Sequence, residues 1–362
     1  MANLRIPGPT PLPDEILQVI GRQMINHRGP EFVQMLREVT ANLHQLFQTK
    51  GDVFLLTGSG TGGLEAAIVN ILSPGDKVLS VSIGVFGNRF ASIAEQFGAE
   101  VTQLNFEWGK AADVDAVRKA LQAEPAIKAV LVTHNETSTG VTNDLASISS
   151  VVKEFDKLLL VDAISSLGSI NLPVDDWHVD VAVTGSQKGW MVPPGLAMVS
   201  MSQEAWQAHA KAKMPRFYWD FTKAKSYLEK GQTPWTPAVS VVFGLSVSLE
   251  IMVKEGLHNI IARHVRLGKA ARDGAKSLGL SLFAEESHAS NTVTSVAASN
   301  GLDTKKMLKI MREEHQIILG GGQQTLDGKI FRIGHLGWVT EEDIEAVIST
   351  LKIVLPQAGF RS

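Results

Sequence analysis

Lys188 is the residue whose type and position say most about the chemistry of this chain. It stands in the segment 185–190 (GSQKGW), directly after the mostly apolar run 179–183, which is typical of a buried strand. An amino group placed among apolar residues at a strand end has a pKa that shifts readily, as a Schiff-base lysine requires. The alternative is that Lys188 is an ordinary solvated lysine beside a strand.

A carboxylate stands in the matching position of another expected strand. The apolar run 158–161 ends in Asp162. Pyridoxal phosphate (PLP) needs a lysine for its aldehyde and an acidic residue for its pyridinium nitrogen. Lys188 and Asp162, each at the end of a strand, therefore indicate a PLP site.

A glycine-rich loop, residues 58–63 (GSGTGG), joins an expected strand to an expected helix. Glycines let the backbone approach a ligand closely, and a helix N-terminus offers free N–H groups to an anion. Ser59 and Thr61 add hydroxyl donors. The loop is thus a candidate anion site, and the alternative is a tight turn without a ligand.

The same loop also matches the G-x-G-x-x-G pattern of dinucleotide-binding oxidoreductases. An NAD-dependent enzyme needs an acidic residue at the end of the following strand, to hold the ribose hydroxyls. That strand ends in residues 79–82 (LSVS) and carries no carboxylate. The oxidoreductase stays as the alternative from another class.

Three further positions could contact a ligand. Phe86 follows the next strand. We expect it either to lie against a planar ring of a ligand or to belong to the core. Thr137 lies in a polar loop, residues 133–140 (THNETSTG), where a strand ends, and ligands of open α/β sheets bind at these ends. Arg332 lies in an apolar strand and needs an anionic partner, either a ligand carboxylate or an internal glutamate.

The elements that carry these residues alternate between strand and helix. Helical spacing of apolar residues marks 32–47, 88–97 and 145–155, and a further helix follows the glycine loop. Apolar runs predict seven strands, at 53–56, 77–81, 99–104, 129–132, 158–161, 179–183 and 196–199. Nearly continuous apolar strands separated by helices imply an α/β fold with a mostly parallel sheet covered on both faces.

The pattern changes after a proline-containing segment at 231–237. A long helical stretch at 240–278 precedes strands near 292–296 and 329–333 and helices near 304–314 and 341–355. These elements predict a smaller α+β unit. We expect an N-terminal arm (1–20), a large domain (21–255) and a small C-terminal domain (256–362).

Composition bounds the possible partners. The chain has 362 residues, 44% of them hydrophobic, with a net charge of -3 and no Lys/Arg-rich run, which argues against nucleic-acid binding. It has no cysteine, which excludes disulfides and thiolate metal sites. We find no secretory signal, membrane-spanning stretch or peroxisomal tripeptide, and expect a cytoplasmic protein without a metal.

Taken together, these motifs resemble the class V aminotransferases of PLP fold type I, in particular the alanine–glyoxylate and serine–pyruvate aminotransferase group. The resemblance covers nearly the whole chain and follows one order. Its segments are 7–11 (PGPTP), 58–60 (GSG), 133–140 (THNETSTG), 161–162 (VD), 185–188 (GSQK), 193–195 (PPG) and 332–334 (RIG).

The resemblance implies roles for the residues around the cofactor. Lys188 would form a Schiff base with PLP and later transfer the substrate proton. Asp162 would keep the pyridine nitrogen protonated, and Thr137 would contact the ring substituents. The phosphate would be held by Ser59, Gly60, Thr61 and Gln187.

The resemblance also implies a substrate clamp and a homodimer. Arg332 would bind the substrate α-carboxylate, helped by the backbone near Gly8. Thr236 would reach the phosphate in the neighbouring subunit, which implies shared active sites. Two positions differ from the family pattern: Phe86 replaces the usual ring-stacking tryptophan, and Thr233 replaces a tyrosine that contacts the phosphate across the dimer.

The predicted activity is ping-pong transfer of an amino group between alanine or serine and glyoxylate or pyruvate. Cysteine desulfurases share the fold but need a cysteine, which this chain lacks. Same-fold enzymes for phosphoserine, aspartate or a ureido amino acid stay as alternatives. Aspartate or phosphoserine would need a second cation, for which Arg28 is the candidate.

Overall fold

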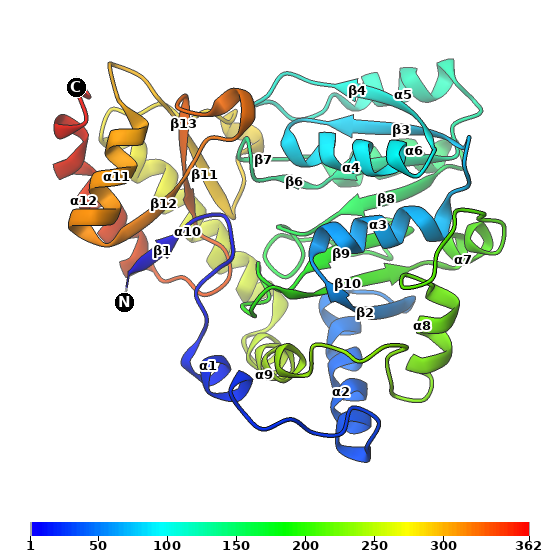
Figure 1. Cartoon of the computed structure of the whole chain (residues 1–362). Helices are drawn as coiled ribbons and strands as arrows, with labels where there is room; N and C mark the ends of the chain where they lie inside the picture. The colour runs from blue at the N-terminus through cyan, green and yellow to red at the C-terminus, as the bar shows by residue number, and fades with distance from the viewer. Residues whose placement is uncertain (1, 362) are drawn as a thin grey trace.

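The computed structural model describes residues 2–361, and a seven-stranded sheet dominates its larger part (Figure 1). The strand order is β2-β10-β9-β8-β5-β3-β4, and all neighbours are parallel except that β10 is antiparallel to both β2 and β9. The predicted seven-stranded, mostly parallel sheet is confirmed. Its strands are β2 (Asp52–Gly58), β3 (Lys77–Ser82), β4 (Glu100–Asn105), β5 (Ala129–Thr133), β8 (Leu158–Asp162), β9 (Val181–Gly185) and β10 (Gly195–Met201).

Helices cover both faces of this sheet. Every residue of β5 and β9 is buried, as expected of central parallel strands that pack on both sides. One face packs against α2, α5, α6 and α9, and the other against α3, α4, α7 and α8. These helices are α2 (Pro30–Phe47), α3 (Gly60–Ile71), α4 (Val85–Gln96), α5 (Val114–Ala123), α6 (Leu145–Glu154), α7 (Gln203–His209), α8 (Phe221–Leu228) and α9 (Val239–Glu255).

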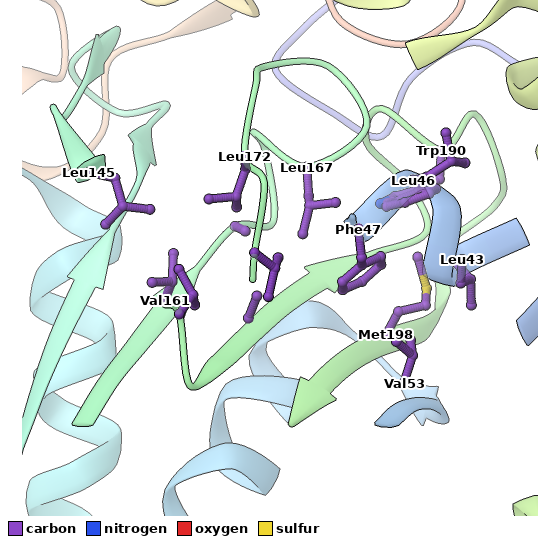
Figure 2. Packing of buried hydrophobic residues seen from close by; sticks show 14 of the residues in the cluster. Leu43, Leu46, Phe47, Val53, Leu145, Val161, Leu167, Leu172, Trp190 and Met198 are labelled. Atoms are coloured by element: carbon purple, nitrogen blue, oxygen red, sulfur yellow. The ribbon is translucent and has the colours of Figure 1, made fainter. Parts of the chain in front are cut away.

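The apolar cluster on the first face fixes the loop that carries Lys188. Figure 2 shows Trp190 packed among Leu46, Phe47 and Met198. The rings of Phe47 and Trp190 are stacked with centroids 5.8 Å apart, and the Trp190 Nε1 group donates to Thr184 Oγ1 at 2.8 Å. The chain two residues after Lys188 is therefore anchored in the core.

A second, four-stranded sheet lies in the C-terminal part, in the order β1-β12-β13-β11. Its first strand comes from the N-terminus and lies beside the C-terminal elements in Figure 1. Three helices and a separate apolar cluster complete this part. The elements are β1 (Asn3–Arg5), β11 (Val293–Ala297), β12 (Ile317–Gly321), β13 (Ile330–Gly334), α10 (Leu257–Ser277), α11 (Thr304–His315) and α12 (Glu341–Gln357). Short elements elsewhere are α1 (Asp14–Ile20), β6 (Asn135–Glu136) and β7 (Val141–Thr142).

Three details differ from the sequence-based expectation. The helical stretch expected at 240–278 consists of two helices, because Gly256 at φ +84° separates α9 from α10. The helix expected from Asn88 begins at Val85, so Phe86 lies in its first turn. Strands β1 and β12 were not predicted. The division at 20 and 255 stays a prediction.

Residues 2–361 contain neither a membrane-spanning helix nor a cluster of metal ligands. None of the helices there is long and apolar enough to cross a membrane. That part of the chain also brings together no group of three or more His, Asp or Glu residues suited to hold a metal ion.

Candidate active site

A cavity of about 160 Å³ opens where parallel strands of the large sheet end. β2, β5, β8 and β9 run in the same direction, so the loops that follow them meet at one edge. Most of the residues singled out in the sequence line this cavity. They are Ser59, Gly60, Thr61, Phe86, Thr137, Asp162, Gln187 and Lys188.

Lys188 is partly buried in the cavity wall and is not the freely solvated lysine of the alternative interpretation. Its Nζ donates a hydrogen bond to the Pro7 carbonyl. Burial lowers the pKa of Lys188 to about 8, and the nearby Asp162 carboxylate opposes this shift. The amino group is therefore neutral more often than that of a surface lysine.

Asp162 ends β8 and is 4% exposed. Its Oδ1 accepts a hydrogen bond from the Ile164 N–H at 3.0 Å, and no lysine or arginine of residues 2–361 forms an ion pair with it. Burial raises the pKa of Asp162 to about 7. A cationic ring nitrogen placed beside this carboxylate would keep it ionised.

The glycine loop packs closely against other residues of the large sheet domain. A Cβ on Gly60 would lie 2.5 Å from Ile164, and a Cβ on Gly63 would lie 2.7 Å from Val183. Ser59 is the N-cap of α3, and its Oγ accepts from the Gly62 N–H at 3.4 Å. Because the first N–H groups of a helix have no acceptor within it, this end of α3 can bind an anion.

Glu136 is a buried residue that the sequence reasoning placed in a polar loop but gave no role. Its carboxylate accepts from the N–H groups of Phe86 (2.9 Å) and Gly87 (3.1 Å), at the start of α4. The Ser138 N–H (3.1 Å) and hydroxyl (2.5 Å) donate to its other oxygen. Glu136, on the short strand β6, thus caps α4 and fixes the turn that carries Phe86.

We predict that Glu136→Gln lowers the stability of the protein by about 2 kcal/mol, because an amide NH₂ then faces buried N–H donors. The measurement is the free energy of unfolding by urea. Glu100→Gln, at an exposed carboxylate on β4, is the matched control and should leave stability unchanged. Equal stabilities of the two variants would contradict the capping role.

Arg332 projects from β13 and is 6% exposed. Its Nε donates to the Gly321 carbonyl and its Nη1 to the Thr137 carbonyl, both at 2.9 Å. Within residues 2–361 no carboxylate lies within ion-pair distance of it, so the internal Arg–Glu pair is not present. Burial lowers the pKa of Arg332 to about 10, so the guanidinium stays charged at neutral pH without an anionic partner.

The remaining predicted residues lie outside the cavity lining. Gly8 packs directly against the Lys188 side chain. Thr236 is exposed and does not line the cavity of its own chain. Arg28 donates to the carbonyls of Thr233 (2.7 Å) and Pro234 (3.2 Å), so it does not supply a second cation to this cavity.

Sequence reasoning missed a different cation, Arg89, which lines the cavity from α4. Its guanidinium carbon lies 4.8 Å from the centre of the Phe86 ring. The two residues are three apart, which places them on the same side of a helix. This spacing from Phe86 is the signal that could have identified Arg89 from the sequence. Leu64, Asn135, Ile164 and Ser165 also line the cavity and were not singled out.

Comparisons with known proteins identify the family of this chain. Residues 6–347 match the family model of the class-V aminotransferases. The chain is 46% identical to the soluble hydrogenase 42 kDa subunit of Anabaena cylindrica, covering 99% of this chain and 94% of that protein. It is 37% identical to the L-aspartate–glyoxylate aminotransferase of Paracoccus denitrificans, covering 98% and 91%.

Solved structures show the same architecture. The crystal structure of alanine–glyoxylate aminotransferase from Nostoc sp. superimposes with a TM-score of 0.94 at 31% identity, covering 98% of this chain and 95% of that one. The fold is that of the fold type I PLP-dependent transferases. By its family match, its relatives and its architecture, the chain belongs to the class V aminotransferases.

Proposed function

We propose that this aminotransferase uses PLP and moves an amino group between alanine or serine and glyoxylate or pyruvate by a ping-pong mechanism. The observation that carries this proposal is that Lys188 and Asp162 meet in one cavity while Arg332 lies beside Thr137 with its charge unpaired. The NAD-dependent oxidoreductase is set aside, because residues 6–347, which include the glycine loop, match the family of class-V aminotransferases.

The residues of the cavity fit PLP. Gln187 Oε1 is buried and has no hydrogen-bond partner within residues 2–361, next to the N-terminus of α3. A glutamine amide can flip so that its NH₂ group takes the place of its oxygen. Gln187 can therefore donate an N–H to a phosphate. A phosphate between Gln187 and the first turn of α3, held by Ser59, Gly60 and Thr61, would satisfy these groups.

When bound, PLP would supply an electron-withdrawing ring that stabilises negative charge on the substrate Cα. The chain's own groups would do the rest. Asp162 would keep a proton on the ring nitrogen, Phe86 would cover the ring face, and Thr137 would lie beside it. The Lys188 amino group, whose pKa is about 8, would take and return the substrate proton near neutral pH.

The proposed substrates follow from the number of fixed charges. Arg332 binds one carboxylate through its guanidinium fork, with the backbone at Gly8 nearby, and this accounts for a small amino acid. Arg89 favours a second candidate, a donor with a second carboxylate such as aspartate, because it is an exposed cation on the cavity wall.

A panel of amino donors distinguishes these two candidates. We expect alanine or serine to give at least tenfold higher kcat/KM than aspartate with glyoxylate or pyruvate as acceptor. Arg89→Gln is the informative variant. If aspartate is the better donor and Arg89→Gln removes that preference while sparing alanine, the small-substrate proposal is wrong and the dicarboxylate candidate replaces it.

A homodimer with shared active sites is also part of this proposal. Thr236 is exposed near the aromatic residues Phe217, Tyr218 and Trp235, whose rings stack together at the surface. Such a surface suits a subunit contact that would carry Thr236 into the site of a second copy. Cytoplasmic location likewise remains a prediction.

A further inference from the structure

The Lys188 amino group is held by the backbone of the N-terminal segment. Its Nζ donates to the carbonyl oxygen of Pro7, a buried residue that lies 181 positions earlier in the chain. A carbonyl oxygen can only accept, so this contact favours the protonated form of the lysine. No sequence pattern around Lys188 indicates this partner.

The residues next to Pro7 fit closely around the lysine. A Cβ on Gly8 would lie 2.6 Å from Lys188 Cδ and 2.8 Å from Nζ, and Gly8 has φ +105°. Both observations require glycine at this position. Thr10 then fastens the segment: its N–H donates to the Gln187 carbonyl and its hydroxyl to the Lys188 carbonyl, each at 3.2 Å.

The same segment begins in the sheet that carries Arg332. β1 pairs with β12, and β12 pairs with β13, where Gly320 is the register partner of Arg332. Pro7 packs on Gly320, since a Cβ there would lie 3.0 Å from the Pro7 ring. Arg5 ties the strand to α12 through an ion pair with Asp343 at 3.4 Å.

We propose that the Pro7 carbonyl is the acceptor that holds the Lys188 ammonium whenever this amine is not joined to the cofactor, and that Gly8 and Thr10 position it. The role of this hydrogen bond in catalysis rests on the proposed function. After Lys188 takes the substrate proton, the ammonium needs an acceptor that does not compete for the substrate. The Pro7 carbonyl supplies this acceptor, and its segment begins in the same four-stranded sheet that positions Arg332.

Charged groups around Lys188 determine whether its pKa rises or falls when the Pro7 acceptor is lost. Asp162 on β8 raises the pKa of the amine, while burial, Arg332 on β13 and Arg89 on α4 lower it. Loss of the Pro7 acceptor leaves these groups in place and removes a bond to the charged form. The pKa of Lys188 must then fall further.

Gly8→Ala tests the inference, because its methyl group cannot coexist with Lys188 at its present distance from Pro7. In full-length protein freed of cofactor, acetylation of Lys188 by acetic anhydride is followed against pH by mass spectrometry of its peptide. We expect the apparent pKa of Lys188 to fall by about one unit. Gly21→Ala is the matched control, since a Cβ there meets nothing nearer than 3.8 Å.

Thr10→Val is the second variant and keeps the Thr10 N–H bond to Gln187. We expect a smaller fall in the pKa of Lys188, and Thr10→Ser, which restores the hydroxyl, should return it to the wild-type value. An unchanged pKa in both Gly8→Ala and Thr10→Val overturns the inference. The labelling needs neither PLP nor substrate, so failure of PLP to attach to Lys188 contradicts only the proposed function.

Discussion

Replacing Lys188 with alanine is expected to lower the kcat of transamination by about four orders of magnitude or more. The variant loses both the amine that would hold the cofactor covalently and the base that would transfer the substrate proton. Its fold should persist, since Trp190 and the core beneath the loop are untouched (Figure 2). The measurement is single-turnover and steady-state transamination with saturating PLP.

Lys211→Ala, at an exposed lysine after α7, is the control and should keep full activity. Urea unfolding of both variants separates loss of the amine from loss of the fold. Transamination by Lys188→Ala at a rate within tenfold of the wild type would remove the lysine from the mechanism.

The second large effect is expected at Arg332. Arg332→Gln should lower kcat/KM for the amino acid by about a hundredfold to a thousandfold, because the substrate carboxylate loses its charged partner inside the protein. The same change removes a buried charge that has no anionic partner in the free protein. We therefore expect the melting temperature to stay the same or rise, although kcat/KM falls.

Arg312→Gln, at an exposed arginine on α11, provides the matched comparison and should change neither quantity. The test uses initial rates over a range of donor concentrations, together with thermal unfolding of each variant. A large fall in melting temperature with unchanged kcat/KM would mean that Arg332 has a structural role and binds no substrate.

Much of the architecture could be predicted because its patterns are local. The central strands of the large sheet, such as β5 and β9, are almost uninterrupted apolar runs, because they are buried on both faces. Strands β1 and β12 escaped prediction for two other reasons. β1 spans Asn3–Arg5 only, and its partner Ile317–Leu319 is more than 300 residues away in the sequence. β12 ends in two glycines, which are uncommon in strands.

The site was predictable where a residue type carries its own chemical reason. Four features each indicate the kind of ligand or partner that they need. They are a lysine and an aspartate at strand ends, a glycine loop before a helix and an arginine in an apolar strand. Glu136 does not, because its role is to accept N–H groups from Phe86 and Gly87, some 50 residues earlier in the chain. The Pro7 carbonyl is harder still, since any residue has a carbonyl and only the folded chain selects this one.

One measurement tests the central claim most directly. The protein is incubated with PLP, reduced with borohydride and digested, and the position of the reduced cofactor is mapped by mass spectrometry. We expect a visible absorption band before reduction and a single modified residue, Lys188, with no label at any site in Lys188→Ala. A protein that stays colourless with PLP, or that carries the cofactor on another lysine, would contradict the account.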